Sequence, residues 1–355
     1  MSTPLLEVDG LSVSFPTDDG TVTAVRGVSF SLSRGEALGI AGESGSGKSV
    51  TSLAIMGLLP SSARVSGSVR LDGEEVLGLS DRALSRIRGR RIAMVFQDPL
   101  TSLTPVYSVG HQIAEALSAH DRRLARRTAR ARAVELLGRV GIPDPAGRAD
   151  AYPHELSGGM RQRAVIAIAM ANAPDVIIAD EPTTALDVTV QAQVLEALEV
   201  ARVETGAALM LITHDLGIIA GHADRVAVMY AGRVVEQADV ETLFAAPRMP
   251  YTLGLLGSLP RLDSERSHRL TPILGTPPSL VNLPAGCPFA PRCPVARADC
   301  VEGEPDAIMI APDHLVACHH HAELVGRGSA DVFATTAADV EVPGTTVPGK
   351  TGGAA

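Results

Sequence analysis

The chain has 355 residues and a formal net charge of −9 at pH 7, and 45% of its residues are hydrophobic. This length suits one large core with a smaller appended unit, and the acidic balance argues against a nucleic-acid-binding protein, whose surface would be basic. The first 15 residues lack the pattern of a signal peptide and no apolar run is long enough to span a bilayer. We therefore expect a cytosolic protein whose four cysteines form no disulfides.

The N-terminal part is predicted to contain a small antiparallel sheet, a buried strand and a helix. Residues 5–13, 22–32 and 65–71 alternate apolar and polar side chains, as strands with one solvent-facing side do. Residues 37–41 form a continuous apolar run, which indicates a buried strand, and residues 50–59 are predicted to be helical.

A complete phosphate-binding loop, GESGSGKS at 42–49, lies between that strand and that helix. Its glycines let backbone N–H groups point at phosphate oxygens, and the helix N-terminus adds a partial positive charge. Lys48, one of only two lysines in the chain, is expected to reach between two phosphates, and the Ser49 hydroxyl to ligate Mg²⁺. The residues expected to bind nucleotide here are Gly42, Ser44, Gly45, Ser46, Gly47, Lys48, Ser49 and Val50.

The middle of the chain is predicted to be helical and is followed by a parallel sheet. A short apolar strand ends at Gln97, and apolar residues then recur at helical spacing from residue 98 to about residue 172. Continuous apolar strands are predicted at 92–96, 176–179, 208–213 and 226–229, with a helix at 188–203.

Two carboxylates follow the strand at 176–179 directly. The carboxyl end of a parallel strand lies at the sheet edge where ligands of such sheets bind, so Asp180 and Glu181 are expected to face the nucleotide. We predict that Asp180 holds Mg²⁺ through water and that Glu181 polarises the water that attacks the γ-phosphate.

The run Leu156-Ser157-Gly158-Gly159-Met160 resembles the signature motif of ABC ATPases, and it precedes the acidic pair as it does in that family. Gln97, Asp187 and His214 stand where the family has its Q-loop, D-loop and switch histidine. The resemblance implies an α/β fold for residues 1–245, a P-loop ABC ATPase domain. It would have a mixed sheet core, an antiparallel β subdomain and a helical subdomain at about 98–172.

The resemblance also implies the roles of these residues and an ATP-driven dimer. Glu181, His214 and Gln97 would be catalytic, and Gln97 would also ligate Mg²⁺. Ser157, Gly158 and Gly159 would act on ATP bound by a second ABC ATPase subunit, a different chain or a second copy. Asp187 would be a further nucleotide-binding residue. Phe15 is the aromatic residue expected to stack on adenine.

Beyond residue 245 the chain becomes proline-rich, and its four cysteines, Cys287, Cys293, Cys300 and Cys318, all lie in this part. Clustered thiols in a reducing compartment indicate a metal or iron–sulfur ligand set, and their spacing is unlike that of zinc knuckles. Residues 246–325 resemble the C-terminal region of oligopeptide/dipeptide importer ATPases, which implies a 4Fe-4S cluster. Zn²⁺ is the alternative. Because the cysteines are remote in sequence from the phosphate loop, we expect the cluster to be structural, and we expect residues 326–355 to be disordered.

The combined interpretation is an ATPase subunit that powers peptide import. It would act at the cytoplasmic face of the membrane, bound to two transmembrane permease subunits that work with an extracytoplasmic peptide-binding protein. The alternatives are the ATPase of a nickel or other small-solute importer and a soluble ABC ATPase outside transport. The sequence leaves open the solute and whether the ATPase pair is made of one chain or two.

Overall fold

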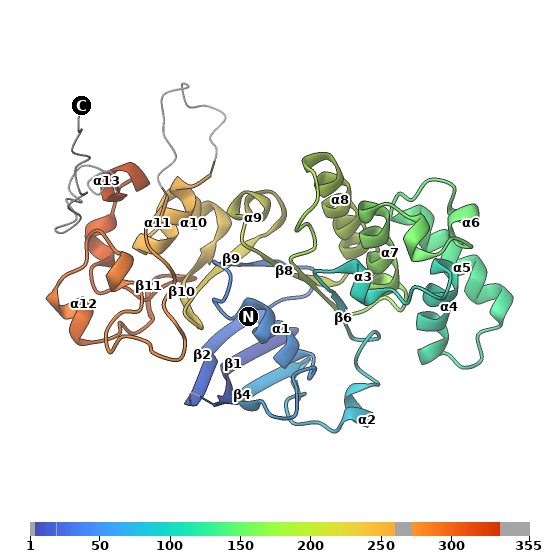
Figure 1. Cartoon of the computed structure of the whole chain (residues 1–355), viewed down its shortest axis with the longest axis horizontal. Helices are drawn as coiled ribbons and strands as arrows, with labels where there is room; N and C mark the ends of the chain where they lie inside the picture. The colour runs from blue at the N-terminus through green and yellow to red at the C-terminus, as the bar shows by residue number, and fades with distance from the viewer. Residues whose placement is uncertain (1–3, 19, 260–271, 334–355) are drawn as a thin grey trace, which may run out of the picture.

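The computed structural model describes residues 4–18, 20–259 and 272–333, and it contains a small and a large sheet (Figure 1). The small sheet is antiparallel with the strand order β2-β1-β4-β5, as the alternating segments near the N-terminus predict. Its strands are β1 (Leu6–Thr17), β2 (Gly20–Leu32), β4 (Arg64–Leu71) and β5 (Glu74–Glu75).

The large sheet is mixed, with the strand order β11-β12-β10-β9-β3-β8-β7-β6. Strands β9, β3, β8, β7 and β6 are parallel, and β10, β12 and β11 continue the sheet in antiparallel pairing. The strands are β3 (Ala37–Ala41), β6 (Ile92–Val95), β7 (Val176–Asp180), β8 (Ala208–Thr213), β9 (Arg225–Tyr230), β10 (Arg233–Asp239), β11 (Ile308–Ala311) and β12 (His314–Val316). The five parallel strands are the buried strands that the sequence predicts, with ends shifted by no more than a residue or two.

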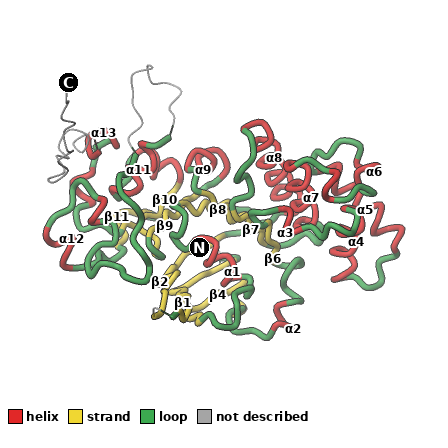
Figure 2. Tube along the Cα trace, viewed as in Figure 1, coloured by secondary structure: helices red, strands yellow, loops and turns green. Residues whose placement is uncertain are grey.

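Helices α3 to α8 lie toward one end of the large sheet and α9 to α13 toward the other (Figures 1 and 2). Helices α1 (Lys48–Ile55) and α2 (Asp81–Leu84) precede the first group. That group consists of α3 (Pro99–Ser102), α4 (Val109–His120), α5 (Arg126–Arg139), α6 (Pro145–Arg148), η1 (Pro153–Glu155), α7 (Gly158–Met170) and α8 (Val188–Thr205). The second comprises α9 (Leu216–His222), α10 (Val240–Ala245), α11 (Pro250–Gly257), η2 (Ala290–Arg292), α12 (Ala298–Glu302), η3 (His321–Leu324) and α13 (Ser329–Phe333). Among the described helices, none combines the length and apolar character that crossing a bilayer requires.

Both faces of the parallel strands are covered, which explains their continuous apolar sequences. On β7, Ile177 and Ala179 pack with the helical side of the molecule, whereas Val176 and Ile178 pack with the small sheet. Each of the four is at most 1% exposed. The strand ends are therefore fixed in register, and the residues that follow them project from one edge.

The C-terminal part packs on the large sheet instead of standing apart from it. Strand β12 pairs with β10, and the Glu236 carboxylate on β10 is fully buried, 2.9 Å from Nε2 of His314 on β12. The same carboxylate accepts hydrogen bonds from the backbone N–H groups of Arg248 and Met249. The C-terminal extension, the part of the chain beyond residue 245, has a hydrophobic core in common with β9 and α9, to which it contributes Phe289.

One expectation is wrong for the part that the structure describes. Residues 329–333, within the stretch expected to be disordered, form α13, and Val332 and Phe333 are buried against the C-terminal core. A five-residue helix is too short to show apolar periodicity, so the sequence pattern could not reveal it. Residues 334–355 lie outside the described residues.

Candidate nucleotide-binding site

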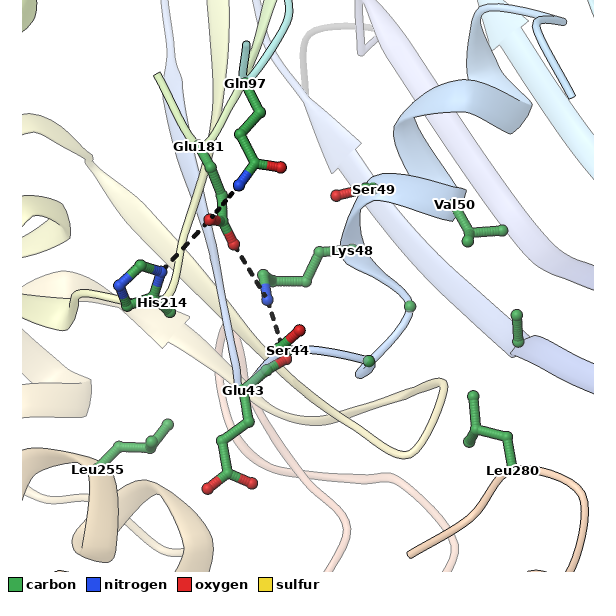
Figure 3. Close-up of a pocket in the computed structure, with 13 residues that line it drawn as sticks. Glu43, Ser44, Lys48, Ser49, Val50, Gln97, Glu181, His214, Leu255 and Leu280 are labelled. Carbon is green, nitrogen blue, oxygen red and sulfur yellow. Dashed lines mark hydrogen bonds and ion pairs between the residues drawn. The ribbon is translucent and has the colours of Figure 1, made fainter. Parts of the chain in front are cut away.

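An open cavity of about 710 Å³ lies at the carboxyl edge of the parallel strands, a size in the range of small-molecule sites (Figure 3). Its lining residues are Ala24, Glu43, Ser44, Gly45, Gly47, Lys48, Ser49, Val50, Gln97, Glu181, His214, Leu255 and Leu280. The phosphate loop thus meets the polar residues that follow β6, β7 and β8, as the order of the parallel strands requires.

The backbone of the phosphate loop is one that only glycine can adopt at its two ends. Gly42 has φ +148° and a Cβ there would lie 2.2 Å from the Met229 carbonyl oxygen, whereas a Cβ on Gly47 would lie 2.5 Å from that of Ala24. At Gly45, φ is +80° and a Cβ would meet nothing within 4 Å, so the middle of the loop faces open space. The buried Ser46 hydroxyl has no hydrogen-bond partner in the described chain. The loop therefore fits a bound phosphate.

Lys48 is held inside this loop at 4% exposure. Its Nζ donates hydrogen bonds to the carbonyl oxygens of Gly42 at 2.7 Å and Glu43 at 3.0 Å, and it lies 3.9 Å from Oε1 of Glu181. Burial lowers the pKa of Lys48, and the charges of Glu181 and Asp180 oppose that shift. The ammonium is thus positioned by the backbone of the loop that it serves.

Ser49 and Asp180 meet where Mg²⁺ is expected. The Ser49 hydroxyl donates a 3.0 Å hydrogen bond to Oδ1 of Asp180. Burial raises the pKa of the Asp180 carboxyl, with a further contribution from Glu181, against the opposing effects of the Ser49 hydrogen bond and of Lys48. A hydroxyl and a buried carboxylate that lacks full charge compensation suit a hard divalent cation, so these residues fit Mg²⁺.

Glu181 lies at the centre of the polar residues of the cavity (Figure 3). Its Oε2 accepts hydrogen bonds from Nε2 of Gln97 at 3.3 Å and from the Thr184 hydroxyl at 2.9 Å, and it lies 3.5 Å from Nδ1 of His214. Its backbone has φ 45°, an uncommon conformation for a residue with a side chain. Three side chains that the sequence analysis selected from three strand ends therefore converge, together with Thr184, which it did not select.

The signature residues lie elsewhere, at the start of α7, and do not line this cavity. Ser157 caps the helix by accepting a hydrogen bond from the backbone N–H of Met160, and Gly158 and Ser157 are exposed. Asp187 caps α8, and a Cβ on Gly159 would lie 2.2 Å from Val190 of that helix. The two motifs are thus packed together at a surface separate from the phosphate loop of the same chain.

Phe15 is not among the lining residues. It lies on β1 opposite Val22 and packs, half-buried, against the core beneath the small sheet. Its contact with adenine stays a prediction. The apolar part of the lining comes instead from Ala24, Leu255 and Leu280, two of them from the C-terminal extension. No motif marks these residues, so the sequence analysis missed them.

The extension also touches the phosphate loop itself. The Arg292 guanidinium forms two hydrogen bonds with the Glu43 carboxylate, at 2.6 and 2.9 Å, across 249 positions of sequence. The cysteine segment is remote from the phosphate loop in sequence but lies beside it in the fold, because Arg292 directly precedes Cys293. The phosphate loop and the cysteine segment meet only in the folded chain, and no local sequence pattern in either predicts the contact.

The four cysteines come from different parts of the extension: Cys287 and Cys293 lie on either side of η2, Cys300 lies on α12, and Cys318 follows β12. Burial raises the pKa of Cys287, Cys293 and Cys318, and neighbouring backbone N–H groups partly oppose that rise. Burial raises the pKa of the Cys293 thiol to about 12 and that of Cys318 to about 11. Cysteine thiolates are the usual protein ligands of iron–sulfur clusters, so four thiols in one segment have the chemistry that such a cluster needs.

A second possible ligand group includes Cys300. Its sulfur, a carboxylate oxygen of Asp299 and a ring nitrogen of His320 lie within 4.8 Å of one another. His320 Nε2 is 3.0 Å from Oδ1 of Asp299, so an ordinary hydrogen bond accounts for this approach. His319 is also engaged, with the Gly303 carbonyl oxygen.

Comparisons with known proteins agree with this geometry. A family model described as ABC transporter matches residues 25–184, and one described as the C-terminal region of oligopeptide/dipeptide transporters matches residues 235–300. The oligopeptide transport ATP-binding protein OppD of Mycobacterium tuberculosis is 58% identical over 330 residues, which cover 93% of this chain and 54% of that protein. The chain therefore spans about half the length of this mycobacterial relative.

Other relatives match over nearly their whole length. The dipeptide transport ATP-binding protein DppD of Bacillus subtilis is 52% identical over 316 residues, which cover 88% of this chain and 94% of that protein. The ATP-binding cassette MJ0796, solved as a dimer in a post-hydrolysis state bound to ADP and Pi, is 27% identical with a TM-score of 0.60, over 66% of this chain and 98% of that one. The chain therefore belongs to the ABC transporter family and, within it, to the family of the transport ATP-binding proteins OppD and DppD.

Proposed function

We propose that this chain binds ATP and Mg²⁺ in the cavity and hydrolyses ATP to power the import of peptides by an ABC transporter. The observation that carries the proposal is the convergence of Gln97, Glu181 and His214 beside the phosphate loop. Peptides are favoured over nickel and over work outside transport because residues 235–300 match the oligopeptide/dipeptide C-terminal region and the relatives named above transport peptides.

The residues have separate tasks in the proposed reaction. Lys48 and the loop N–H groups hold the β- and γ-phosphates, and Ser49, Asp180 and Gln97 hold Mg²⁺, which neutralises charge on those phosphates when it is bound. Glu181 orients the attacking water and accepts its proton, a task that suits a carboxylate with 15% of its side chain exposed. His214, 59% exposed in the single chain, is positioned by Glu181 and free to reach the γ-phosphate.

The remaining signature residues are assigned to a partner. Ser157, Gly158 and Gly159 present the N-terminus of α7 at the surface, and we infer that they bind the γ-phosphate held by a second ABC ATPase subunit. The dimeric state of the similar cassette supports this arrangement. Two permease subunits would hold the pair at the cytoplasmic face of the membrane, in contact with the region of Gln97, and would receive peptides from an extracytoplasmic binding protein.

Two substitutions test the hydrolytic role. Glu181→Gln keeps the shape of the side chain but cannot accept a proton, so the ATPase rate of the assembled transporter should fall by about 10²–10⁴-fold while ATP affinity is kept. Lys48→Ala should instead abolish ATP binding. An unchanged ATPase rate for Glu181→Gln would remove Glu181 from catalysis. Failure of the transporter to import a labelled peptide, with ATPase activity intact, would refute the peptide assignment alone.

We further propose that Cys287, Cys293, Cys300 and Cys318 hold a 4Fe-4S cluster. Four thiols in one segment support it, and binding to iron would offset the free-energy cost of ionising thiols whose pKa burial raises. Protein purified without oxygen should be brown and contain about four irons and four sulfides per chain. One zinc per chain in colourless protein would support the alternative, and Asp299→Ala and His320→Ala should then lower the zinc content.

A further inference from the structure

Arg292 lies in the segment between Cys287 and Cys293, called here the cysteine loop, and it binds the phosphate loop through Glu43. Arg292 has 5% of its side chain exposed, and both of its terminal nitrogens contact the Glu43 carboxylate. Nη1 also lies 3.3 Å from the Tyr230 hydroxyl, and Nε donates to the carbonyl oxygen of Leu274. A bidentate pair of this kind is specific in geometry, and without it Arg292 would be an uncompensated buried charge and Glu43 an unpaired, partly buried one.

A second contact from the extension reaches the backbone at the same residue. The Tyr251 hydroxyl, on α11, accepts a 2.8 Å hydrogen bond from the backbone N–H of Glu43, and the Tyr251 side chain is fully buried. Phe289, of the cysteine loop, packs against the rings of Tyr251 and Tyr230, with centroids 5.4 and 5.3 Å apart. Arg292 and Phe289 therefore fix one face of the phosphate loop together with Tyr251.

Glu43 occupies a sensitive position for ATP. It lines the cavity, its carbonyl oxygen accepts a hydrogen bond from Lys48, and its carboxylate points away from Lys48 and Glu181 (Figure 3). Released from Arg292, this carboxylate would be an unpaired negative charge on a residue of the phosphate loop, in a partly buried site where charges are poorly screened and would oppose the binding of the anionic nucleotide.

We propose that Arg292 and Tyr251 are positioning residues of the ATP site, through which ATP affinity depends on the ordered cysteine loop. The inference rests on the proposed function. Cys287 and Cys293 bracket the segment that carries Phe289 and Arg292, so whatever holds these two cysteines in place also holds the arginine on Glu43. The cysteine segment is thereby connected to nucleotide binding, beyond any role in stability.

The test is a titration of ATP with Mg²⁺ into the full chain, purified without oxygen and followed by calorimetry. Arg292→Ala should weaken ATP binding by about tenfold or more, because it leaves the Glu43 charge unpaired. Glu43→Gln in the Arg292→Ala background should restore most of the affinity, since it removes that charge. The matched control is Arg297→Ala, in the same segment, whose pair with Glu323 is half-exposed and does not involve the phosphate loop.

Equal ATP affinities for wild type and Arg292→Ala would overturn the proposal, as would a loss that Glu43→Gln does not rescue. If Arg292→Ala fails to fold, the ATP affinities of the single variants Tyr251→Phe and Glu43→Gln are compared with that of the wild type instead. Tyr251→Phe keeps the ring and removes only the acceptor of the Glu43 N–H, so a few-fold loss of ATP affinity is expected in a chain that stays folded, with a lowered melting temperature. No change would contradict the positioning role. Absence of ATP binding by the wild type would instead refute the proposed function, and this inference with it.

Discussion

Replacing Gly158 by alanine separates the proposed action on a partner's nucleotide from the chain's own fold. Gly158 is the exposed first residue of α7, and a Cβ there would meet Leu186 at 3.6 Å, an ordinary contact. The substitution should therefore leave stability unchanged or raise it by about 0.4–1 kcal/mol, as glycine-to-alanine changes at permissive positions do. At Gly159 the same change would place a Cβ 2.2 Å from Val190, so that position cannot serve the comparison.

The substitution should lower the ATPase rate only where two ATPase subunits close on bound ATP. A methyl group at the helix N-terminus displaces the phosphate from the backbone N–H groups, and a hydrogen bond to a charged group contributes about 1.5–3 kcal/mol. Loss of one such bond should lower the ATPase rate of the assembled transporter by about 10–100-fold. ATP affinity of the isolated chain, measured in parallel, should not change.

A matched control and a clear refutation are available. Gly221→Ala makes the same change on helix α9, where a Cβ would meet nothing within 4 Å, and should leave the ATPase rate unaltered. If Gly158→Ala hydrolyses ATP at the wild-type rate, the start of α7 does not contact a phosphate. If the isolated chain loses ATP affinity as well, the signature acts within its own chain and the two-subunit site is wrong.

Three further predictions concern the loop, the tail and pH. Gly42→Ala should abolish ATP binding, measured by calorimetry, because its Cβ would lie 2.2 Å from a backbone oxygen that cannot move aside. Phe333→Ala should lower the free energy of unfolding by about 3 kcal/mol in denaturant titrations, since the ring is 3% exposed, whereas Val325→Ala, at a 60% exposed site, should change it by less than about 0.5 kcal/mol. Equal effects would show that α13 does not pack. The iron-free chain should lose stability as pH rises from about 9 toward 12, because the thiol of Cys293 ionises near pH 9 when unfolded but is held protonated to about 12 when folded. A melting temperature that is constant over this range, or unaltered in its pH profile by Cys293→Ala, would contradict the burial of that thiol.

The nucleotide loop and the polar residues around it were predictable because their positions follow from local rules. Strand, glycine loop and helix are contiguous in sequence, so Lys48 and Ser49 are placed by their neighbours alone. Gln97, Glu181 and His214 each follow a parallel strand, and the carboxyl ends of parallel strands meet at one edge. Their convergence thus needed only the order of motifs along the chain, without knowledge of any side-chain contact.

The C-terminal part could not be predicted in the same way. Strand β12 has three residues, and α13 has five, both below the length at which periodicity separates a helix from a strand. Glu236 would be placed at the surface by its charge, yet it is fully buried because two backbone N–H groups and His314 satisfy it. A buried carboxylate becomes understandable only when its partners, 12 to 78 positions away, are known.

Within the described residues, polar side-chain contacts join the extension to three parts of the ATPase, which limits how its role can be tested. Glu236 connects it to the large sheet, Glu304 pairs with Arg26 of the small sheet, and Arg292 pairs with Glu43 of the phosphate loop. Truncating the chain after residue 245 would leave each ATPase-side charge without its partner, and removing one member of a buried pair is strongly destabilising. A truncated protein that loses ATPase activity would therefore report misfolding as readily as a lost cluster. Only point substitutions that keep the other two contacts can separate the effect of the cysteines on nucleotide binding from their effect on the fold.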